Sequence, residues 1–331
     1  MSRSSSAVIV SPALADANNG NWRTAQRWQQ MLAPQRPVRI VREWPDAQAA
    51  SDGVMLALHA RRSAAAVRAW SEAHPGRGLA VVLTGTDLYQ DLATSAEARH
   101  SVAVAQRLVV LQERGVEALD APLRPKARVI YQSGPAWPPL AKPRDGLGAV
   151  SVGHLRAVKT PQTLFEAARL MRDRADIRIT HIGDGGGEPL LAQQARDTQR
   201  DCPGYEWLGA LPHDATLQRI REAHVLVHTS AMEGGAHVIL EAVRCGTPVL
   251  ASRVDGNVGM LGADYEGYFP HGDAAALARL LQDCRATQSD NPAPGLLDRL
   301  AAQCALRAPL FDADAERRAL LNLLQELEPT P

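Results

Sequence analysis

The stretch "HTSAMEGGAHVILEAVRCGTPVLAS" (His228–Ser252) contains the change of pattern that decides the fold. An apolar run leads into it, and a bend of small residues follows at Gly234 and Gly235. A helical pattern with two glutamates comes next, and the apolar run "PVLAS" closes the stretch. This order predicts a strand, a loop, a helix and a second strand, as in the repeating unit of a parallel sheet.

The same alternation runs through most of the chain. Longer amphipathic stretches such as "WRTAQRWQQML" and "SAAAVRAWSEA" lie between short apolar runs that are rich in β-branched residues. The first five of these runs are Ala7–Val10, Val38–Val41, Val54–His59, Leu79–Thr84 and Arg107–Leu111. Repetition of strand and helix predicts an α/β protein whose parallel sheet is covered by helices on both faces.

A stretch rich in proline and glycine, "QSGPAWPPLAKPRDGLG" (Gln132–Gly148), interrupts this alternation. The pattern then restarts, so we predict two doubly wound, Rossmann-like domains, 1–135 and 149–331, joined by a stiff linker at 136–148. The last helical stretch, Asp312–Leu327, suits packing on either domain. Ligands bind at the carboxyl ends of the strands in such sheets, so we expect the chemistry in loops that border a cleft between them.

Composition excludes several classes of function. The chain has 331 residues, of which 45% are hydrophobic and 22% charged, and 36 basic residues balance 36 acidic ones. A neutral chain without a basic block is not expected to bind nucleic acid. No run approaches the ~20 apolar residues of a membrane span, so no membrane partner is expected. The four cysteines lack metal-ligand spacing and are expected to be reduced thiols of a cytoplasmic protein.

The bend before the predicted helix suits a phosphate group. Gly234 and Gly235 allow a ligand to approach the backbone, and a helix that begins near Gly235 has free N–H groups for an anion. Glu241 falls about six residues into that helix, roughly 9 Å along its axis, near the reach from a nucleotide's diphosphate to its ribose. Glu233 stands at the helix mouth, where a sugar attached to the diphosphate would lie. The alternative is that Glu241 is a solvated helix residue and that Glu233 is a charge favoured near a helix start.

The spacing of the two glutamates resembles that of a known family. Glu233, seven intervening residues, Glu241 and then "CGTPVLAS" resemble the signature of family 4 glycosyltransferases of the GT-B fold. "VSVGHLRAVKTPQTLFEA", "THIGDGGGEPLL" and "YEWLGALPHDATLQRI" are similar to three further blocks of that family, in the same order. Lys159 falls on the family's lysine. His154 stands where the family has an arginine, and Arg156 is expected to take over that role.

This resemblance implies a GT-B fold, with two Rossmann-like domains facing a cleft and a nucleotide-sugar donor bound by the second domain. It implies the following residues for the UDP-sugar: His154, Arg156, Lys159, Gly183, Leu211, Glu233, Gly234, Gly235, Ala236, His237 and Glu241. The expected catalytic residues are Glu233, Lys159, Arg156 and His59.

Five segments resemble more narrowly the selenosugar synthases of selenoneine biosynthesis: "ANNGNWRTAQRW", "LALHARRS", "LTGTDLYQDL", "GHLRAVKTP" and "VDGNVGMLG". The resemblance implies that selenophosphate attacks the anomeric carbon of a UDP-sugar, chiefly UDP-N-acetylglucosamine, and that UDP leaves. Loss of the phosphoryl group would then give a selenosugar. It also implies functional coupling to an enzyme that produces selenophosphate and to the downstream selenoneine synthase.

A selenophosphate acceptor is already anionic, so it needs backbone donors and cations rather than a base. The helix start "NNGNWRT" offers such groups, and its alternative interpretation is an asparagine-rich cap without a ligand. The residues expected to hold the acceptor phosphate are Asn18, Asn19, Gly20, Asn21, Arg23 and Thr24. His59, at the end of a predicted strand, is a candidate contact for the transferred sugar or the acceptor, although a lone histidine is more often structural.

No cofactor or metal is expected. The chain lacks an Asp-x-Asp pair at a strand–loop junction that would hold a divalent ion, and cations with helix N–H groups are expected to neutralise the diphosphate. "GDGGGE" (Gly183–Glu188) begins like a dinucleotide-binding fingerprint, but Glu188 and Pro189 break that pattern. Two other functions stay open: a retaining glycosyltransferase with an alcohol or thiol acceptor, and a non-catalytic protein that binds nucleotide sugars.

Overall fold

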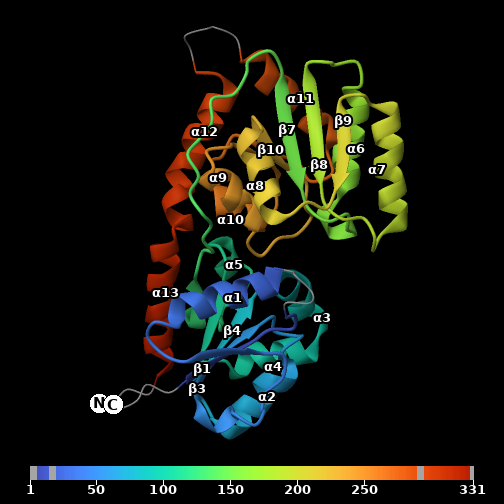
Figure 1. Ribbon diagram of the computed structural model, residues 1–331. Coiled ribbons are helices and arrows are strands. Elements are labelled where there is room, and N and C mark those ends of the chain that lie inside the picture. The colour runs from blue at the N-terminus through green and yellow to red at the C-terminus, as the bar shows by residue number, and fades with distance from the viewer. Residues whose placement is uncertain (1–5, 15–19, 289–293, 329–331) are drawn as a thin grey trace. The chain divides into compact units, whose positions relative to one another are not determined.

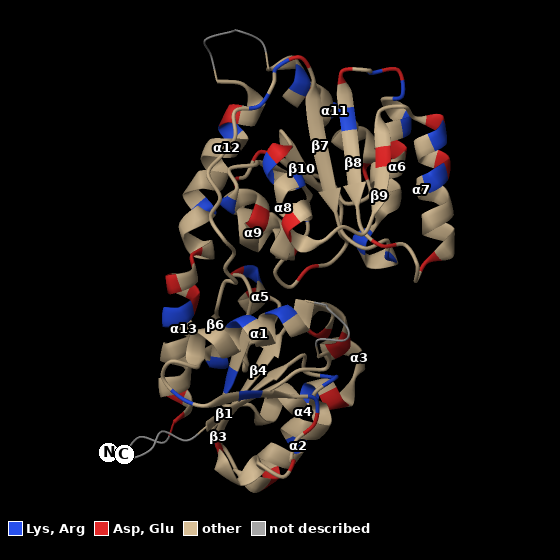
Figure 2. Cartoon of the chain, in the orientation of Figure 1, with Lys and Arg blue, Asp and Glu red and all other residues tan. Residues whose placement is uncertain are grey.

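The computed structural model describes residues 6–14, 20–288 and 294–328. These residues divide into two compact units, each built on its own six-stranded sheet (Figure 1). The first unit holds the described residues through Ser133 and those from Asp312 onward, and the second runs from Gly134 to Phe311. Charged residues of both signs are spread over both units, in keeping with a net charge of zero (Figure 2).

The sheet of the first unit has the strand order β2-β1-β3-β4-β5-β6, and every neighbouring pair is parallel. Its inner strands are continuous apolar runs because helices cover both faces, and all five residues of β4 are buried. The strands are β1 (Ser6–Val10), β2 (Val38–Val41), β3 (Asp52–Leu58), β4 (Leu79–Leu83), β5 (Arg107–Val110) and β6 (Ala127–Val129).

The helices of this unit are α1 (Gly20–Leu32), α2 (Ala64–Ala73), α3 (Leu92–Thr94), α4 (Ala96–Val104), α5 (Arg114–Glu117) and α13 (Ala313–Leu327). A five-residue π-helix, Asp87–Asp91, precedes α3. One face of the sheet forms a core with α2 and α4, in which Trp70 is fully buried. The other face forms a core with α1 and α13, in which Trp28 is fully buried.

The last helix, α13, packs against α1, although the sequence alone suits either domain. Glu316 of α13 is 1% exposed and is fully paired within the unit. Its carboxylate accepts hydrogen bonds from Trp28 Nε1 at 2.7 Å and from the Ser133 N–H at 2.8 Å, and it pairs with Arg27 at 2.9 Å. These partners offset the cost of burying the charge and fix the helix to the sheet.

The second unit has the strand order β12-β11-β10-β7-β8-β9, again all parallel. Its strands are β7 (Leu147–Val152), β8 (Ile177–Ile182), β9 (Tyr205–Gly209), β10 (Val225–His228), β11 (Val249–Ser252) and β12 (Tyr268–Phe269). Its helices are α6 (Pro161–Leu170), α7 (Pro189–Asp201), α8 (His213–Glu222), α9 (His237–Arg244), α10 (Asp255–Leu261), α11 (Ala274–Ala286) and α12 (Leu296–Arg307). The stretch His228–Ser252 begins at the last residue of β10 and contains the loop after it, α9 and β11.

The sequence pattern missed two strands, β6 and β12, which lie at the edges of the two sheets. They have three and two residues, which is too short to show a period. The proline-rich stretch is without regular structure from Tyr131 to Pro143, as its composition suggests. None of the described helices has the length and hydropathy needed to cross a membrane.

Candidate functional site

An ion pair joins two loops at the carboxyl ends of β7 and β10. Lys159 ends a 3-10 turn (Ala157–Lys159) after β7, and Glu233 lies in the loop between β10 and α9. Lys159 Nζ lies 2.5 Å from Glu233 Oε1. Neighbouring parallel strands end at the same edge of a sheet, which is why two residues so far apart in sequence meet there.

Two threonines hold these loops against each other. Thr160 directly follows Lys159 and has a left-handed backbone (φ 41°), a rare conformation for a β-branched residue. Its hydroxyl donates a hydrogen bond to the Thr229 carbonyl, and the hydroxyl of Thr229 donates to the Lys159 carbonyl at 2.7 Å. The reciprocal bonds fix the backbone of Lys159 relative to the loop that carries Glu233.

The Glu233 carboxylate is stabilised in its ionised form. Burial raises its pKa, but the Lys159 ammonium and the adjacent His228 ring outweigh burial and hold the pKa well below its usual range. His228 is 3% exposed, and its Nε2 lies 3.2 Å from Glu233 Oε1. The start of α10 closes over the same loop, because a Cβ at Gly256 would lie 2.0 Å from the Glu233 carbonyl oxygen.

The helix after this loop begins later than the sequence predicted. α9 starts at His237 with Ala236 as its N-cap, so the predicted start near Gly235 is wrong by two residues. Glu241 therefore lies one turn into the helix, about 6 Å along its axis. The N–H groups of Gly234 and Gly235 donate to no described residue. They remain available to an anion at the positive end of the helix.

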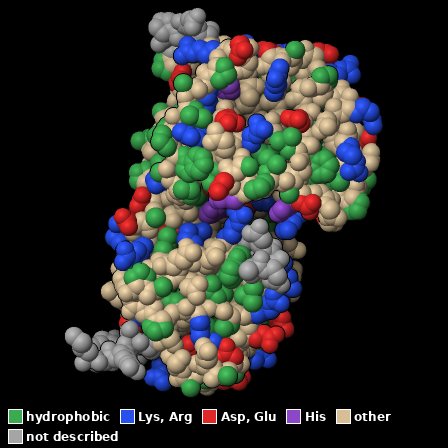
Figure 3. Space-filling view, viewed as in Figure 1, with side chains coloured by type: hydrophobic (Ala, Val, Ile, Leu, Met, Phe, Trp, Pro, Cys, Tyr) green, Lys and Arg blue, Asp and Glu red, His purple; other side chains and the backbone are tan. Residues whose placement is uncertain are grey.

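Glu241 is 5% exposed and is held by imidazole groups. His213, the first residue of α8, has its Nε2 2.7 Å from Glu241 Oε1. His237, one turn before Glu241 on α9, has its Nε2 3.5 Å from the same oxygen. On the face shown in Figure 3, histidine side chains lie beside basic ones.

Four further residues named from the sequence lie along this edge. Gly183 follows β8, and a Cβ there would come 1.9 Å from a neighbouring carbonyl oxygen, so only glycine fits. His154 Nδ1 accepts a backbone hydrogen bond at 3.3 Å. Leu211 is half-buried between β9 and α8. Arg156 is exposed, and its guanidinium has no partner among the described residues, so it is available to a ligand.

A small cavity lies beside the ion pair. Its volume is about 10 Å³, room for about one water molecule, and His154, His181 and His228 are among its lining residues. His181 Nδ1 lies 2.8 Å from the Tyr205 hydroxyl. Burial lowers the pKa of His181 to about 4, so this ring is neutral near pH 7. Its position in the core indicates a structural role.

The first-unit candidates lie at the carboxyl ends of the neighbouring strands β1 and β3. β3 ends at Leu58, so His59 lies just outside it, with a positive φ of 73°. The His59 ring is 2% exposed, its Nδ1 accepts the Arg62 N–H at 3.4 Å, and its Nε2 lies 3.2 Å from Thr86 Oγ1. Burial lowers the pKa of His59, with a nearby carboxylate opposing the shift. Both ring nitrogens are therefore engaged inside the unit.

The candidate acceptor residues gather at the start of α1, which follows β1. Asn18 and Asn19 lie outside the described residues, and α1 begins at Gly20. The Thr24 hydroxyl donates to the Gly20 carbonyl at 2.8 Å and accepts from Gln132 Nε2 at 2.5 Å. This hydroxyl is thus engaged within the unit. Asn21 and Arg23, also of α1, are half-buried and have partners of their own.

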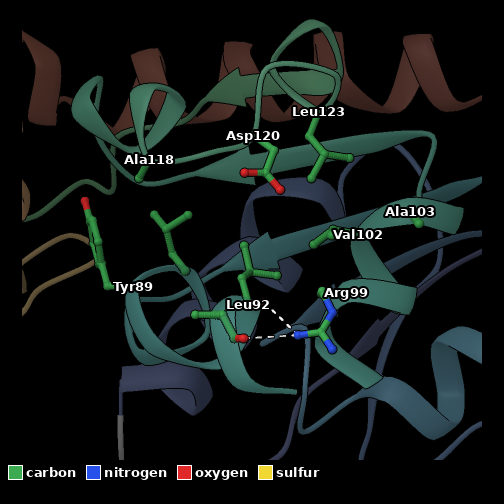
Figure 4. A pocket seen from close by; sticks show the side chains of 10 residues that line it. Tyr89, Leu92, Arg99, Val102, Ala103, Ala118, Asp120 and Leu123 are labelled. Carbon is green, nitrogen blue, oxygen red and sulfur yellow. Dashed lines mark hydrogen bonds between the residues drawn. The ribbon is translucent and has the colours of Figure 1, made fainter. Parts of the chain in front are cut away.

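A larger cavity lies elsewhere in the first unit, between the π-helix, α3 and α4 on one side and the segment after α5 on the other (Figure 4). Its volume is about 440 Å³, and its walls are mostly aliphatic. The Asp120 carboxylate points into it from the segment after α5, and Arg99 donates hydrogen bonds to the carbonyls of Leu92 and Ala93 in α3. No residue named from the sequence lines it. Across the described part of the chain, no three His, Cys, Asp or Glu side chains are grouped to hold a metal ion.

Comparison with known proteins relates the second unit to sugar-transferring enzymes. Residues 138–289 match the family model described as glycosyl transferases group 1. The D-inositol 3-phosphate glycosyltransferase of Thermobifida fusca is 30% identical over 160 residues, which cover 44% of this chain and 37% of that protein. The enzyme of the same name from Pseudarthrobacter chlorophenolicus is 36% identical over 109 residues, covering 31% and 26%. The chain thus aligns with well under half the length of these relatives.

Solved structures resemble both units together. HepE from Anabaena, in complex with UDP and glucose, has a TM-score of 0.73 at 15% identity and covers 98% of this chain and 100% of its own. Sucrose-phosphate synthase from Thermosynechococcus elongatus has a TM-score of 0.74 at 18% identity and covers 97% and 98%. The fold is GT-B. The predicted fold class is therefore confirmed, and in this GT-B chain the group 1 match falls on the unit that carries Lys159, Glu233 and Glu241.

Sequence reasoning did not select four residues that shape the second-unit edge. Thr160 and Thr229 cross-link the two loops, His228 contacts Glu233, and His213 holds Glu241. Their contacts come from neighbouring strands and helices rather than from sequence spacing. His213 stands directly after "ALP", which follows the end of β9 at Gly209, and a histidine at a helix start soon after a strand was the only signal for it.

Proposed function

We propose that the chain is a glycosyltransferase that uses a UDP-sugar as donor. The observation that carries this proposal is the grouping at one sheet edge of the Lys159–Glu233 ion pair, two unbonded N–H groups and the buried Glu241. This set offers a cation and donors for a diphosphate and a carboxylate for a ribose diol. The group 1 match and the names of the relatives support the same class of reaction.

The expected roles follow from the chemistry of each group. The Lys159 ammonium and the exposed Arg156 guanidinium would neutralise the diphosphate together with the N–H groups of Gly234 and Gly235, so we propose that no metal is required. Glu241 would accept hydrogen bonds from the ribose hydroxyls. The diphosphate would replace Glu233 as the partner of Lys159. The Glu233 carboxylate would then be available to contact the transferred sugar. The HepE complex with UDP-glucose supports a UDP-sugar as the donor class.

For the acceptor we propose selenophosphate, with UDP-N-acetylglucosamine as the chief donor. The support is the resemblance of five sequence segments to selenosugar synthases. Selenium would attack the anomeric carbon and form the C–Se bond as the C–O bond to UDP breaks, and UDP would take the electron pair. Water would then cleave the P–Se bond, giving a selenosugar and phosphate. The start of α1, with Gly20, Asn21 and Arg23, is the proposed phosphate contact, and His59 a candidate contact in the same unit.

The reaction would lie between two others. An enzyme that produces selenophosphate would supply the acceptor, and selenoneine synthase would consume the selenosugar. We propose a cytoplasmic location, since all four cysteines are free and buried, as expected for a reducing compartment.

Two alternatives differ in the acceptor or in the absence of one. The relatives that carry the name D-inositol 3-phosphate glycosyltransferase favour an alcohol acceptor, which would use the same donor residues. A non-catalytic nucleotide-sugar-binding protein is less well supported, because Lys159, Glu233 and Glu241 are all present.

The test is to incubate the purified protein with UDP-N-acetylglucosamine and fresh selenophosphate in the presence of EDTA and to follow products by mass spectrometry. A species with the selenium isotope pattern at the selenosugar mass, formed with UDP, would support the full proposal. Consumption of the donor only with alcohols or thiols would support the first alternative. UDP binding without turnover of any acceptor would support the second, and a requirement for added metal would contradict the proposed metal independence.

A further inference from the structure

A histidine contact makes the two oxygens of Glu241 unequal. His213 Nε2 lies 2.7 Å from Oε1, and an ionised carboxylate only accepts, so this nitrogen carries the hydrogen whichever charge the ring has. The second oxygen, Oε2, accepts no hydrogen bond from any described residue. In the described structure, Oε1 of this carboxylate is therefore bonded to the protein and Oε2 is available to a ligand.

The anchor fixes the direction in which the carboxylate faces. Glu241 is 5% exposed on α9, and its side chain would otherwise rotate about its terminal torsion, which is broad for glutamate. His213 is the first residue of α8, and the α8 and α9 helices pack against each other. The hydrogen bond from the imidazole therefore holds the Glu241 carboxylate in a fixed position relative to α8. A fixed carboxylate can accept from two adjacent hydroxyls at defined positions, using Oε2 and the second lone pair of Oε1.

We infer that His213 is a positioning residue that makes Glu241 selective for a ribose with both hydroxyls over a deoxyribose. The inference rests on the proposed function, in which Glu241 binds the ribose of a UDP-sugar. A site built to pair both hydroxyls penalises a ligand that lacks one, because a polar group is then left without its partner. A freely rotating carboxylate would instead pair with the one remaining hydroxyl and lose most of this discrimination.

The other groups near the imidazole do not replace it. His237 Nε2 is 3.5 Å from Glu241 Oε1, beyond the usual hydrogen-bond distance, and lies on the same helix as Glu241. Asp214 Oδ1 is 3.9 Å from His213 Nδ1, but the Asp214 side chain is 93% exposed and so is strongly screened by solvent. The short contact from α8 is therefore the one that sets the carboxylate.

The experiment compares UDP with 2′-deoxy-UDP by isothermal titration calorimetry on the full chain. In His213→Phe, which keeps a ring but has no N–H, we expect the Kd for UDP to rise about tenfold and the Kd for 2′-deoxy-UDP to change less than about twofold. His213→Gln places an amide N–H near the Nε2 position and should restore most of the preference for UDP. Asp214→Asn removes the exposed charge next to His213 and leaves the imidazole in place, so it is the matched control and should shift the preference by less than about twofold.

The outcomes separate this inference from the proposed function. If the unaltered protein binds no UDP, the proposed UDP-sugar donor fails. If it binds UDP and 2′-deoxy-UDP equally, or if His213→Phe weakens both ligands equally, the positioning role of His213 is wrong while UDP binding stands. Should His213→Phe fold poorly by circular dichroism, the Gln variant and His213→Asn, whose shorter amide cannot reach Oε1, provide the same comparison.

Discussion

The strand-end edges of the two sheets use polar residues in opposite ways. In the first unit the Asp87 carboxylate is fully buried and accepts hydrogen bonds from the N–H groups of Ala60, Thr84 and Gly85 at 2.8–2.9 Å. His59 and Thr24 are also paired inside the unit. Their polar groups bond one another and stabilise the loops.

In the second unit several polar groups at the same kind of edge are left without a partner among the described residues. Arg156 and the N–H groups of Gly234 and Gly235 have no described partner, and Glu241 has an oxygen to spare. This difference supports the proposal that the donor binds at the edge of the second unit. Polar residues at a strand end are thus not evidence of a site until their partners are counted.

The largest effect expected from this comparison is on Lys159. Removing its charge in Lys159→Ala would lower kcat with UDP-N-acetylglucosamine by about 10²–10³-fold, because negative charge on the leaving diphosphate grows as the bond breaks. The KM for the donor should change much less. Steady-state kinetics on the proposed reaction would measure both values.

Lys126→Ala is the matched control for this variant, since Lys126 Nζ bonds a backbone carbonyl in the first unit. It should leave kcat within about twofold of the unaltered enzyme, as exposed contacts of this kind contribute little. Equal losses in the two variants would mean that Lys159 acts through folding rather than at the diphosphate.

Loss of the Asp87 side chain is expected to lower the stability of the protein and not its activity. The change in the free energy of unfolding should be similar in size to the change in activation free energy expected for Lys159→Ala. Asp87→Ala leaves three backbone N–H groups without their acceptor, and we expect the free energy of unfolding to fall by about 3 kcal/mol. Donor affinity should stay within about twofold, because the proposed donor residues lie in the second unit. Urea denaturation and UDP titration measure the two quantities.

Asp91→Ala provides the control. Among the described residues the Asp91 carboxylate forms an ion pair with the half-exposed Arg61 at 2.9 Å, and His59 Nε2 lies farther away, at 3.8 Å. Loss of the Asp91 carboxylate should cost less than about 1 kcal/mol. A variant at Asp87 that kept its stability but lost UDP would reverse the comparison and move the ligand site to the first unit.

A smaller effect concerns the buried His181 of the second unit. Burial lowers its pKa from 6.5 to about 4, so between these values the unfolded chain binds a proton that the folded chain does not. Stability from this residue is therefore complete above pH 6.5, is lost as the pH falls to about 4, and changes no further below that. His181→Gln should flatten the pH dependence of the unfolding free energy by about 1–3 kcal/mol over this window. An unchanged profile would show that the ring is not buried as a neutral group.

Much of this architecture was predictable from the sequence, because buried parallel strands are continuous apolar runs separated by amphipathic helices. The eleven-residue amphipathic stretch "WRTAQRWQQML" lies within α1, and "PVLAS" contains β11. The edge strands β6 and β12 were missed because two or three residues carry no period. The start of α9 was placed two residues early because glycines and alanines permit several boundaries and no side-chain cap marks one.

The site was predictable only where residues act through their position in one motif. Glu233 and Glu241 were selected from their spacing and Lys159 from the family resemblance. The roles of His213, His228 and Thr229 depend instead on which strands and helices are neighbours in space. Thr24 and His59 were selected as ligand contacts because sequence shows a polar residue but not its partner. In the structure, both already have partners.

The smallest effect is expected from Thr229, whose hydroxyl holds the backbone of Lys159 and supplies no charge to the site. The Thr229 hydroxyl is 2.7 Å from the Lys159 carbonyl, and Thr229→Val removes this bond while keeping the shape of the side chain. We expect about a fivefold loss in kcat, near 1 kcal/mol for one hydrogen bond, with a midpoint of thermal unfolding within a few degrees of the original. Thr229→Ser keeps the hydroxyl and should restore the rate. If the valine variant lost stability but not rate, the cross-link would serve the fold alone, and the preformed character of the second-unit edge would depend on its charges rather than on the geometry of its loops.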